Sequence, residues 1–408
     1  MTPLRVRRAV VLAALAAVWA VSAWLLWRSR VPASLHLPHL DARQFFSAAQ
    51  LHTSDSFSRI DGVLWVGGLI VQLVVLAVYA ERGHRFMRES AAGPIGTGML
   101  LGMIGFAILW FAELPFTVLD LWWQRRHHLS QVGYFSAIFG NWFALGGEFL
   151  FLSLALLIVM GFARLVGDRW WLPAAPVFVG LATLFAFITP YLLQTHRLDD
   201  PQLAAAAVRL EQREHVSHTP VVVEDVHDVT SLPNAESTGL GPSRRVVVWD
   251  TLLDGRFSER ELDVVLAHEF GHLARNHIWK DVGWYALFAF PGAFLISRAV
   301  RRRGGMAVPE AVPLALLVLV VLNLLALPLQ NVITRHQESE ADWLALQTTH
   351  DPTAARQLFR EFVPTTYDEP NPGFLDYVLR ENHPTIMQRI AMTIAWQRRY
   401  ATSAAQSP

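Results

Sequence analysis

The sequence contains no cysteine, and among its 408 residues it has one lysine, Lys280. Without cysteine the chain has no disulfide, thiolate metal ligand or thiol nucleophile, so any zinc site must use histidine, aspartate or glutamate. Charged residues are also scarce, at 17% against about 25% in soluble domains. The formal net charge is zero, which argues against a nucleic-acid partner. With 53% hydrophobic residues, the composition indicates a membrane protein.

Long apolar stretches account for the shortage of charge. A bilayer core about 30 Å thick needs about 20 apolar helical residues, and we predict seven such spans, at residues 9–27, 62–80, 97–119, 143–165, 171–193, 282–296 and 312–329. The alternative for the first is a cleaved signal peptide. It is longer than a usual signal core and lacks the small residues of a cleavage site, so we expect it to be retained. Arginine is used almost to the exclusion of lysine, as in high-GC bacterial genomes. We therefore expect an integral multi-pass protein of a bacterial cell membrane.

The segment Glu261–His277 contains the pattern His-Glu-x-x-His, at His268, Glu269 and His272. Its apolar residues recur with helical spacing, at Leu262, Val265, Leu266 and Leu273. On a helix the two histidines lie one turn apart on the same face, so both imidazoles can bind one metal ion. Glu269 lies beside them, where it can take a proton from a metal-activated water. The pattern is typical of zinc hydrolysis of amides, and a chance match on a surface helix is the alternative.

The polar stretches divide the chain into two predicted domains. Residues 1–193 form an N-terminal membrane domain with five spans, and residues 194–408 form a metallopeptidase domain that the last two spans interrupt. The fold class is mostly α, a polytopic membrane protein with about seven transmembrane helices and a small β-sheet in the metallopeptidase domain. The β-branched runs at 220–226 and 245–249 predict the strands, and the residues between them predict a loop.

A catalytic zinc site needs a third protein ligand. Glu338 and Asp342, just after the last span, are four residues apart and share a helical face. One of them can bind metal while the other orients a ligand histidine, and Arg335, a turn earlier, can hold one of these carboxylates. An ordinary charged helix start is the alternative. The competing candidates for the third ligand are Glu340, His336 and His350.

Five motifs occur in order in the second half of the chain. They are Asn234-Ala235 with Gly239 and Gly241, Arg245–Leu253, His268–His272 with Asn276-His277, Asn331–Asp342, and His383-Pro384 with Arg389-Ile390. Together they resemble the type I CAAX prenyl protease family of zinc metallopeptidases, seven-span enzymes that cleave behind prenylated cysteines. The resemblance is strong from Ile188 to Ile390, whereas the first spans match only in number and character.

The resemblance implies a fold with a large intramembrane chamber. It also implies which residues bind the metal and which residues act beside it. It implies that His268, His272 and Glu338 bind one zinc ion per chain. It also implies that Glu269 is the general base and that Asp342 holds a ligand histidine. The expected function is a membrane-embedded zinc metalloendopeptidase that hydrolyses peptide bonds with a metal-activated water.

The resemblance also implies residues that contact the substrate. Asn234 and Ala235 are expected on a strand edge that binds the substrate backbone. His383 and Arg389 are expected near the transition-state oxygen or the metal ligands, although a simple turn is the alternative for His383-Pro384. The expected partners are a peptide or protein substrate, lipid-modified or membrane-inserted, and membrane lipids. Ser339 stands where the family usually has an aromatic residue, a departure that concerns the substrate more than the chemistry.

Two other functions fit parts of the sequence. The related heat-shock membrane proteases, which degrade misfolded membrane proteins, have the same motifs but are shorter, with fewer spans. A seven-span scaffold or transporter with a relic metal site is the non-catalytic alternative, and the intact Glu269 argues against it.

Orientation in the membrane has two opposed indications. Arginines near the start, after the second and fourth spans and at Arg298–Arg303 fall on one side, which the positive-inside rule places in the cytoplasm. The resemblance implies the opposite arrangement, with the catalytic site in the cytoplasm.

Overall fold

Helices dominate the computed structural model, which describes residues 3–85, 90–140 and 142–405. The long helices are α1 (Pro3–Trp27), α2 (Ala48–Arg82), α3 (Gly93–Arg126), α4 (Trp142–Val166), α5 (Trp171–Leu192), α8 (His277–Val300) and α9 (Val312–Thr349). Within the described residues, six of them, α2 to α5, α8 and α9, are long and apolar enough to cross a membrane. In α1 the apolar stretch is shorter, Ala13–Trp27. The seven predicted spans lie on these seven helices.

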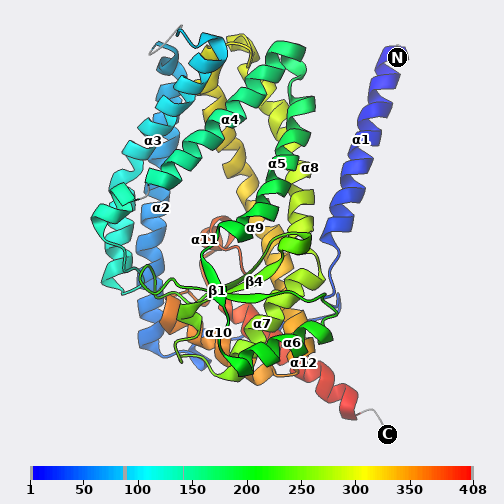
Figure 1. Cartoon of the computed structure of the whole chain (residues 1–408). Coiled ribbons are helices and arrows are strands. Elements are labelled where there is room, and N and C mark those ends of the chain that lie inside the picture. The colour runs from blue at the N-terminus through cyan, green and yellow to red at the C-terminus, as the bar shows by residue number, and fades with distance from the viewer. Residues whose placement is uncertain (1–2, 86–89, 141, 406–408) are drawn as a thin grey trace.

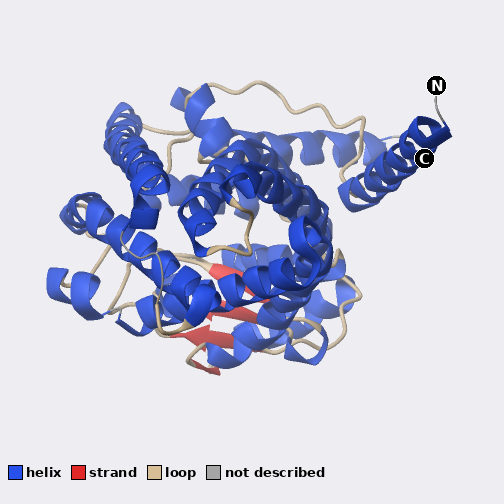
Figure 2. Ribbon diagram, turned by 90° about the horizontal axis from the view of Figure 1, so that it is seen from above, coloured by secondary structure: helices blue, strands red, loops and turns tan. Residues whose placement is uncertain are grey.

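The long helices run side by side, and the strands and short helices gather at one end of them (Figure 1). The C-terminal ends of α2, α4 and α8 and the N-terminal ends of α3, α5 and α9 lie together at the opposite end (Figure 1). Seen from above, the strands lie to one side of the long helices (Figure 2). The first helix approaches the others along α8, where the Trp19 indole nitrogen donates to the Leu287 carbonyl at 3.2 Å.

Four strands form one sheet in the order β1-β2-β4-β3. They are β1 (Thr195–Arg197), β2 (Val221–Glu224), β3 (Ala235–Thr238) and β4 (Arg245–Trp249). The central pair β2 and β4 is parallel, and β1 and β3 each pair antiparallel at the edges. The prediction of a loop between β2 and β4 is wrong for residues 235–238. This segment is polar apart from its first residue and lacks the alternation of a half-buried strand, and pairing with β4 makes it a strand.

Helix α7 (Glu259–Ala274) carries the His-Glu-x-x-His pattern and begins at the predicted capping box. The Glu261 carboxylate accepts from the Ser258 backbone N–H at 2.7 Å and from its hydroxyl at 2.6 Å. Gly271 faces α9, where an added Cβ would lie 3.4 Å from the Ala341 Cα. The two backbones therefore pack closely enough for side chains of α7 and α9 to meet around one point.

The remaining helices hold this pair in place. They are α6 (Pro201–Arg213), α10 (Pro352–Thr366), α11 (Phe374–Leu379) and α12 (Ile386–Ala405). The core that joins α7, α9 and α12 includes Leu266, Phe270, Trp343, Leu346 and Ile390, each at most 1% exposed. Such close packing lets few side-chain positions vary, so the polar groups above this core are rigidly supported.

Candidate metal centre

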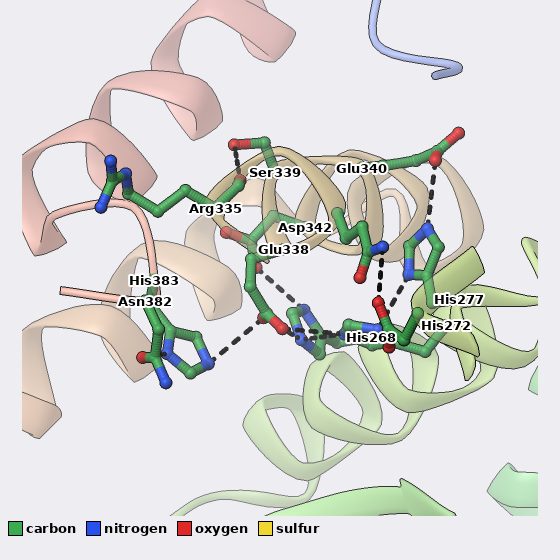
Figure 3. Close-up of polar contacts among 12 residues, drawn as sticks. His268, His272, His277, Arg335, Glu338, Ser339, Glu340, Asp342, Asn382 and His383 are labelled. Carbon is green, nitrogen blue, oxygen red and sulfur yellow. Dashed lines mark hydrogen bonds and ion pairs between the residues drawn. The ribbon is translucent and has the colours of Figure 1, made fainter. Parts of the chain in front are cut away.

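Three side chains from two helices converge above the core. His268 and His272 lie on α7 and Glu338 lies on α9. The two histidine Nε2 atoms are 3.0 Å apart, and Glu338 carboxylate oxygens lie 3.1 Å from the His268 Nε2 and 3.5 Å from the His272 Nε2. One ligand atom of each residue lies within 4.8 Å of the others, in a search confined to the described residues. Figure 3 shows these side chains pointing toward one another.

This donor set fits a divalent metal ion. Two imidazole nitrogens and one carboxylate oxygen are the protein ligands of one common class of catalytic zinc site, in which the remaining position is open to water. Both imidazoles turn Nε2 toward Glu338, and both have their Nδ1 atoms in contact with other side chains. The ring orientations are therefore fixed in the way a metal ligand requires.

Asp342 orients the first histidine. Its carboxylate lies 3.0 Å from the His268 Nδ1 and accepts from the Arg389 guanidinium at 2.7 and 2.9 Å. Burial alone would lower the pKa of His268, but its contacts with Asp342 and Glu338 outweigh burial and raise this pKa to about 10. The two carboxylates thus favour the protonated form of His268 when no metal is bound.

The prediction that Arg335 holds Glu338 or Asp342 is wrong. Arg335 donates instead to the Tyr377 and Glu381 backbone carbonyls, and its guanidinium lies 4.2 Å from the centre of the Tyr377 ring. Figure 3 shows it turned away from Glu338. Arg389 of α12 contacts Asp342 in its place.

Glu269 is buried beside the three converging side chains, at 6% exposure. It faces a cavity of about 110 Å³ that Asn234, Ala235, His383 and Arg389 also line. Burial raises the pKa of the Glu269 carboxyl above its ordinary value, although the neighbouring histidines and a hydrogen bond from the Ser237 backbone N–H oppose this. The cavity thus combines a proton acceptor, a strand edge and two basic side chains.

His383 reaches the cavity from the loop between α11 and α12. Its Nε2 lies 3.3 Å from a Glu338 oxygen, and its Nδ1 lies 2.7 Å from the Asn382 amide oxygen. Half of the His383 side chain is exposed. It is therefore placed to contact both the converging side chains and a molecule that enters the cavity.

The competing candidates for a third ligand lie elsewhere. The ring of His336 stacks on Trp27 at 3.9 Å between centroids. His350 packs against Trp396. Glu340 is fully buried on another face of α9 and contacts His277. From the sequence we assign no role to His277, yet its position five residues after His272 was a signal that it lies near the same site.

A mostly helical membrane protein with a buried His-Glu-x-x-His centre is a membrane metallopeptidase. The sequence pattern of Peptidase family M48 matches residues 197–396, and the chain belongs to this family. It is 30% identical over 213 residues to "Protease HtpX homolog" of Acidiphilium cryptum, covering 47% of this chain and 72% of that protein. The chain is an integral multi-pass membrane protein.

Other similar proteins cover different shares of the chain. "Uncharacterized metalloprotease YhfN" of Bacillus subtilis is 24% identical over 385 residues, 89% of each chain. "CAAX prenyl protease 1" of Saccharomyces cerevisiae is 31% identical over 153 residues, 36% of this chain and 32% of that protein. The crystal structure of S. mikatae Ste24p has the same fold, with a TM-score of 0.72 at 18% identity over 92% of this chain and 95% of that one. The chain therefore combines the fold of Ste24p with membership of a metallopeptidase family.

Proposed function

We propose that the chain is a zinc endopeptidase in which His268, His272 and Glu338 hold one zinc ion and Glu269 is the general base. The observation that carries this proposal is the position of Glu269. It is buried next to the two histidines and faces the same cavity as the strand edge at Asn234 and Ala235. A zinc ion held there would supply Lewis acidity, which would polarise a peptide carbonyl and make a bound water more acidic.

The free edge of β3 is where a substrate backbone would bind. β3 pairs with β4 on one side only. The Asn234 carbonyl accepts from the Trp249 N–H of β4, so the Ser237 N–H points away from β4, toward Glu269. Alternate residues of a strand point their backbone groups to the same edge, so Ala235 offers its N–H and C=O on this free edge. A peptide added there as a further strand takes its register from these hydrogen bonds.

We assign a catalytic or positioning role to three polar residues that line the cavity. Glu269 takes a proton from the attacking water and delivers it to the leaving nitrogen. His383, half exposed and beside Glu338, donates to the oxygen of the scissile carbonyl as it gains charge. Arg389 acts through Asp342, because its guanidinium is engaged with that carboxylate and lies over the Phe359 ring at 4.2 Å. It is a positioning residue.

Two substrate classes are compatible with this chemistry. We propose a peptide or protein with a lipid-modified or membrane-inserted segment. The cavity is lined by residues of β3 and α7, and these elements lie at one end of the long helices (Figure 1). The similarity to a protein named a protease HtpX homolog supports the second candidate, quality control of misfolded membrane proteins. Both candidates use the same chemistry.

The test compares three substrates with one preparation of enzyme in lipid nanodiscs. They are a prenylated peptide, the same peptide without its lipid, and casein. We expect the lipid-modified peptide to have the largest kcat/KM, because the lipid can partition beside the site while the peptide reaches β3. Preferential cleavage of casein would favour quality control, and cleavage of none of them would contradict the proposed endopeptidase.

A further inference from the structure

A second buried polar group lies behind the metal centre and reaches it through one histidine. Glu340 on α9 is 0% exposed. One carboxylate oxygen accepts from the Arg275 side chain at 2.7 Å and from the Arg30 backbone N–H at 2.6 Å. The other accepts from the Lys280 ammonium at 3.0 Å and lies 3.1 Å from the His277 Nε2. With both oxygens engaged, this buried carboxylate is held in one position.

The ring nitrogens of His277 and His272 face each other. Their Nδ1 atoms are 2.9 Å apart, so one must donate and the other must accept. The His272 Nε2 faces Glu338 and His268. If this nitrogen binds the metal, His272 carries its proton on Nδ1 and donates it to the His277 Nδ1. The proton of His277 then lies on Nε2, which faces the Glu340 carboxylate.

We propose that His277 and Glu340 are positioning residues that fix the ring and tautomer of His272 as a metal ligand. This inference rests on the proposed metal site. It adds to the contact between Asp342 and His268 a second contact that holds a ligand histidine from outside the metal site. His268 receives its carboxylate directly, from Asp342 at 3.0 Å. His272 receives its carboxylate through a relay, His272 to His277 to Glu340 (Figure 3).

The helix geometry explains why the second contact needs a relay. Glu338 and Asp342 share one face of α9, whereas Glu340, midway between them, projects to another face. Its carboxylate meets His277 at the first position of α8. Asn276 makes this possible, because its left-handed backbone (φ 53°, ψ 43°) ends α7 and starts α8 without a loop. Asparagine tolerates this conformation better than most residues.

The segment that leaves the first helix completes the surroundings of Glu340. The Arg30 backbone N–H donates to it, and Lys280 donates both to Glu340 and to the Arg28 carbonyl, at 3.2 Å. The segment that follows α1 therefore contacts Glu340 directly through the Arg30 N–H and indirectly through Lys280. The compact ammonium group of Lys280 thus satisfies two acceptors at once.

The experiment measures metal binding and not only activity. We purify the wild type, His277→Leu, His277→Asn and Glu340→Gln, remove metal, and titrate zinc against a competing chelator and Co²⁺ by visible absorption. His277→Leu is expected to weaken zinc binding about 10- to 100-fold, the usual effect of losing an outer contact, and to change the Co²⁺ spectrum. His277→Asn is expected to recover most of the affinity, because its amide oxygen can accept from the His272 Nδ1–H. Glu340→Gln is expected to give an intermediate loss.

The matched control is Ser243→Ala, which removes a buried hydroxyl that hydrogen-bonds the Leu240 backbone, away from the cavity. It is expected to lower the melting temperature without changing zinc affinity or the Co²⁺ spectrum. Wild-type affinity and spectrum in His277→Leu, or in Glu340→Gln should the leucine variant not fold, would overturn the relay. A wild type that binds no metal would overturn the metal centre itself, and the relay with it.

Discussion

Replacing Glu269 with glutamine is expected to lower peptide hydrolysis about 10²- to 10⁴-fold, the usual contribution of a general base, while metal content stays at the wild-type level. Glutamine has nearly the same shape and can still accept from the Ser237 N–H that now bonds the carboxylate. It cannot take a proton from water. Cleavage measured by mass spectrometry and metal content measured on the same preparation separate the two effects.

The matched control is Glu261→Gln on the same helix. Glu261 accepts from Ser258 in the capping box, and glutamine is an accepted residue at that position of the box. This control is expected to cleave at close to the wild-type rate. Wild-type cleavage by the Glu269 variant would remove Glu269 from the mechanism, and loss of metal in that variant would mean that Glu269 is itself a ligand.

The pH dependence of kcat/KM provides a second test of the role of Glu269. Burial raises the pKa of the Glu269 carboxyl above its ordinary value of 4.5. A base works only when deprotonated, so kcat/KM is expected to fall as the pH drops through this raised pKa. The acidic limb of the profile therefore lies above the ordinary range of a carboxylate. The residual activity of the glutamine variant is expected to lack this limb.

Replacing Glu338 with alanine is expected to remove the metal and, with it, activity. Glu338 is the carboxylate that both histidine Nε2 atoms face, and its loss leaves two nitrogen donors where a catalytic zinc site needs three ligands. Metal affinity is expected to fall by more than about 100-fold, the upper range for outer contacts alone. Metal analysis after dialysis measures the loss.

The neighbouring variant Ser339→Ala controls for disturbance of α9. The Ser339 hydroxyl donates to the Arg335 carbonyl one turn earlier, and Figure 3 shows the Ser339 side chain turned away from that of Glu338. It is expected to keep its metal. Retention of one metal per chain by Glu338→Ala would show that a different side chain supplies the third ligand.

The part of the site that lies on single helices could be predicted from the sequence, because the helical repeat alone determines which side chains share a face. The spacing of His268 and His272 places both imidazoles on one face, and the spacing of Glu338 and Asp342 does the same. The structure brings these two faces together. Spacing alone left Glu340 open as a ligand, because it does not say which face of α9 meets α7. Packing around Gly271 decides this.

Contacts between distant elements were harder to predict. Arg335 has the right spacing to hold Glu338 or Asp342, yet the Tyr377 ring and two backbone carbonyls bind it, and Arg389 reaches Asp342 from 47 residues further on. Strand β3 is specified by backbone pairing with β4 and by no apolar alternation of its own. The Arg30 contact with Glu340 spans 310 residues, and no local pattern encodes it.

X-ray absorption at the zinc edge of the purified, zinc-loaded wild type tests the central claim most directly. We predict one zinc ion per chain with two imidazoles at about 2.0–2.1 Å and the remaining ligands oxygen. The Glu338→Ala variant should bind no zinc to measure. A spectrum with three imidazoles, or with none, would contradict the assignment of His268, His272 and Glu338 as the ligands.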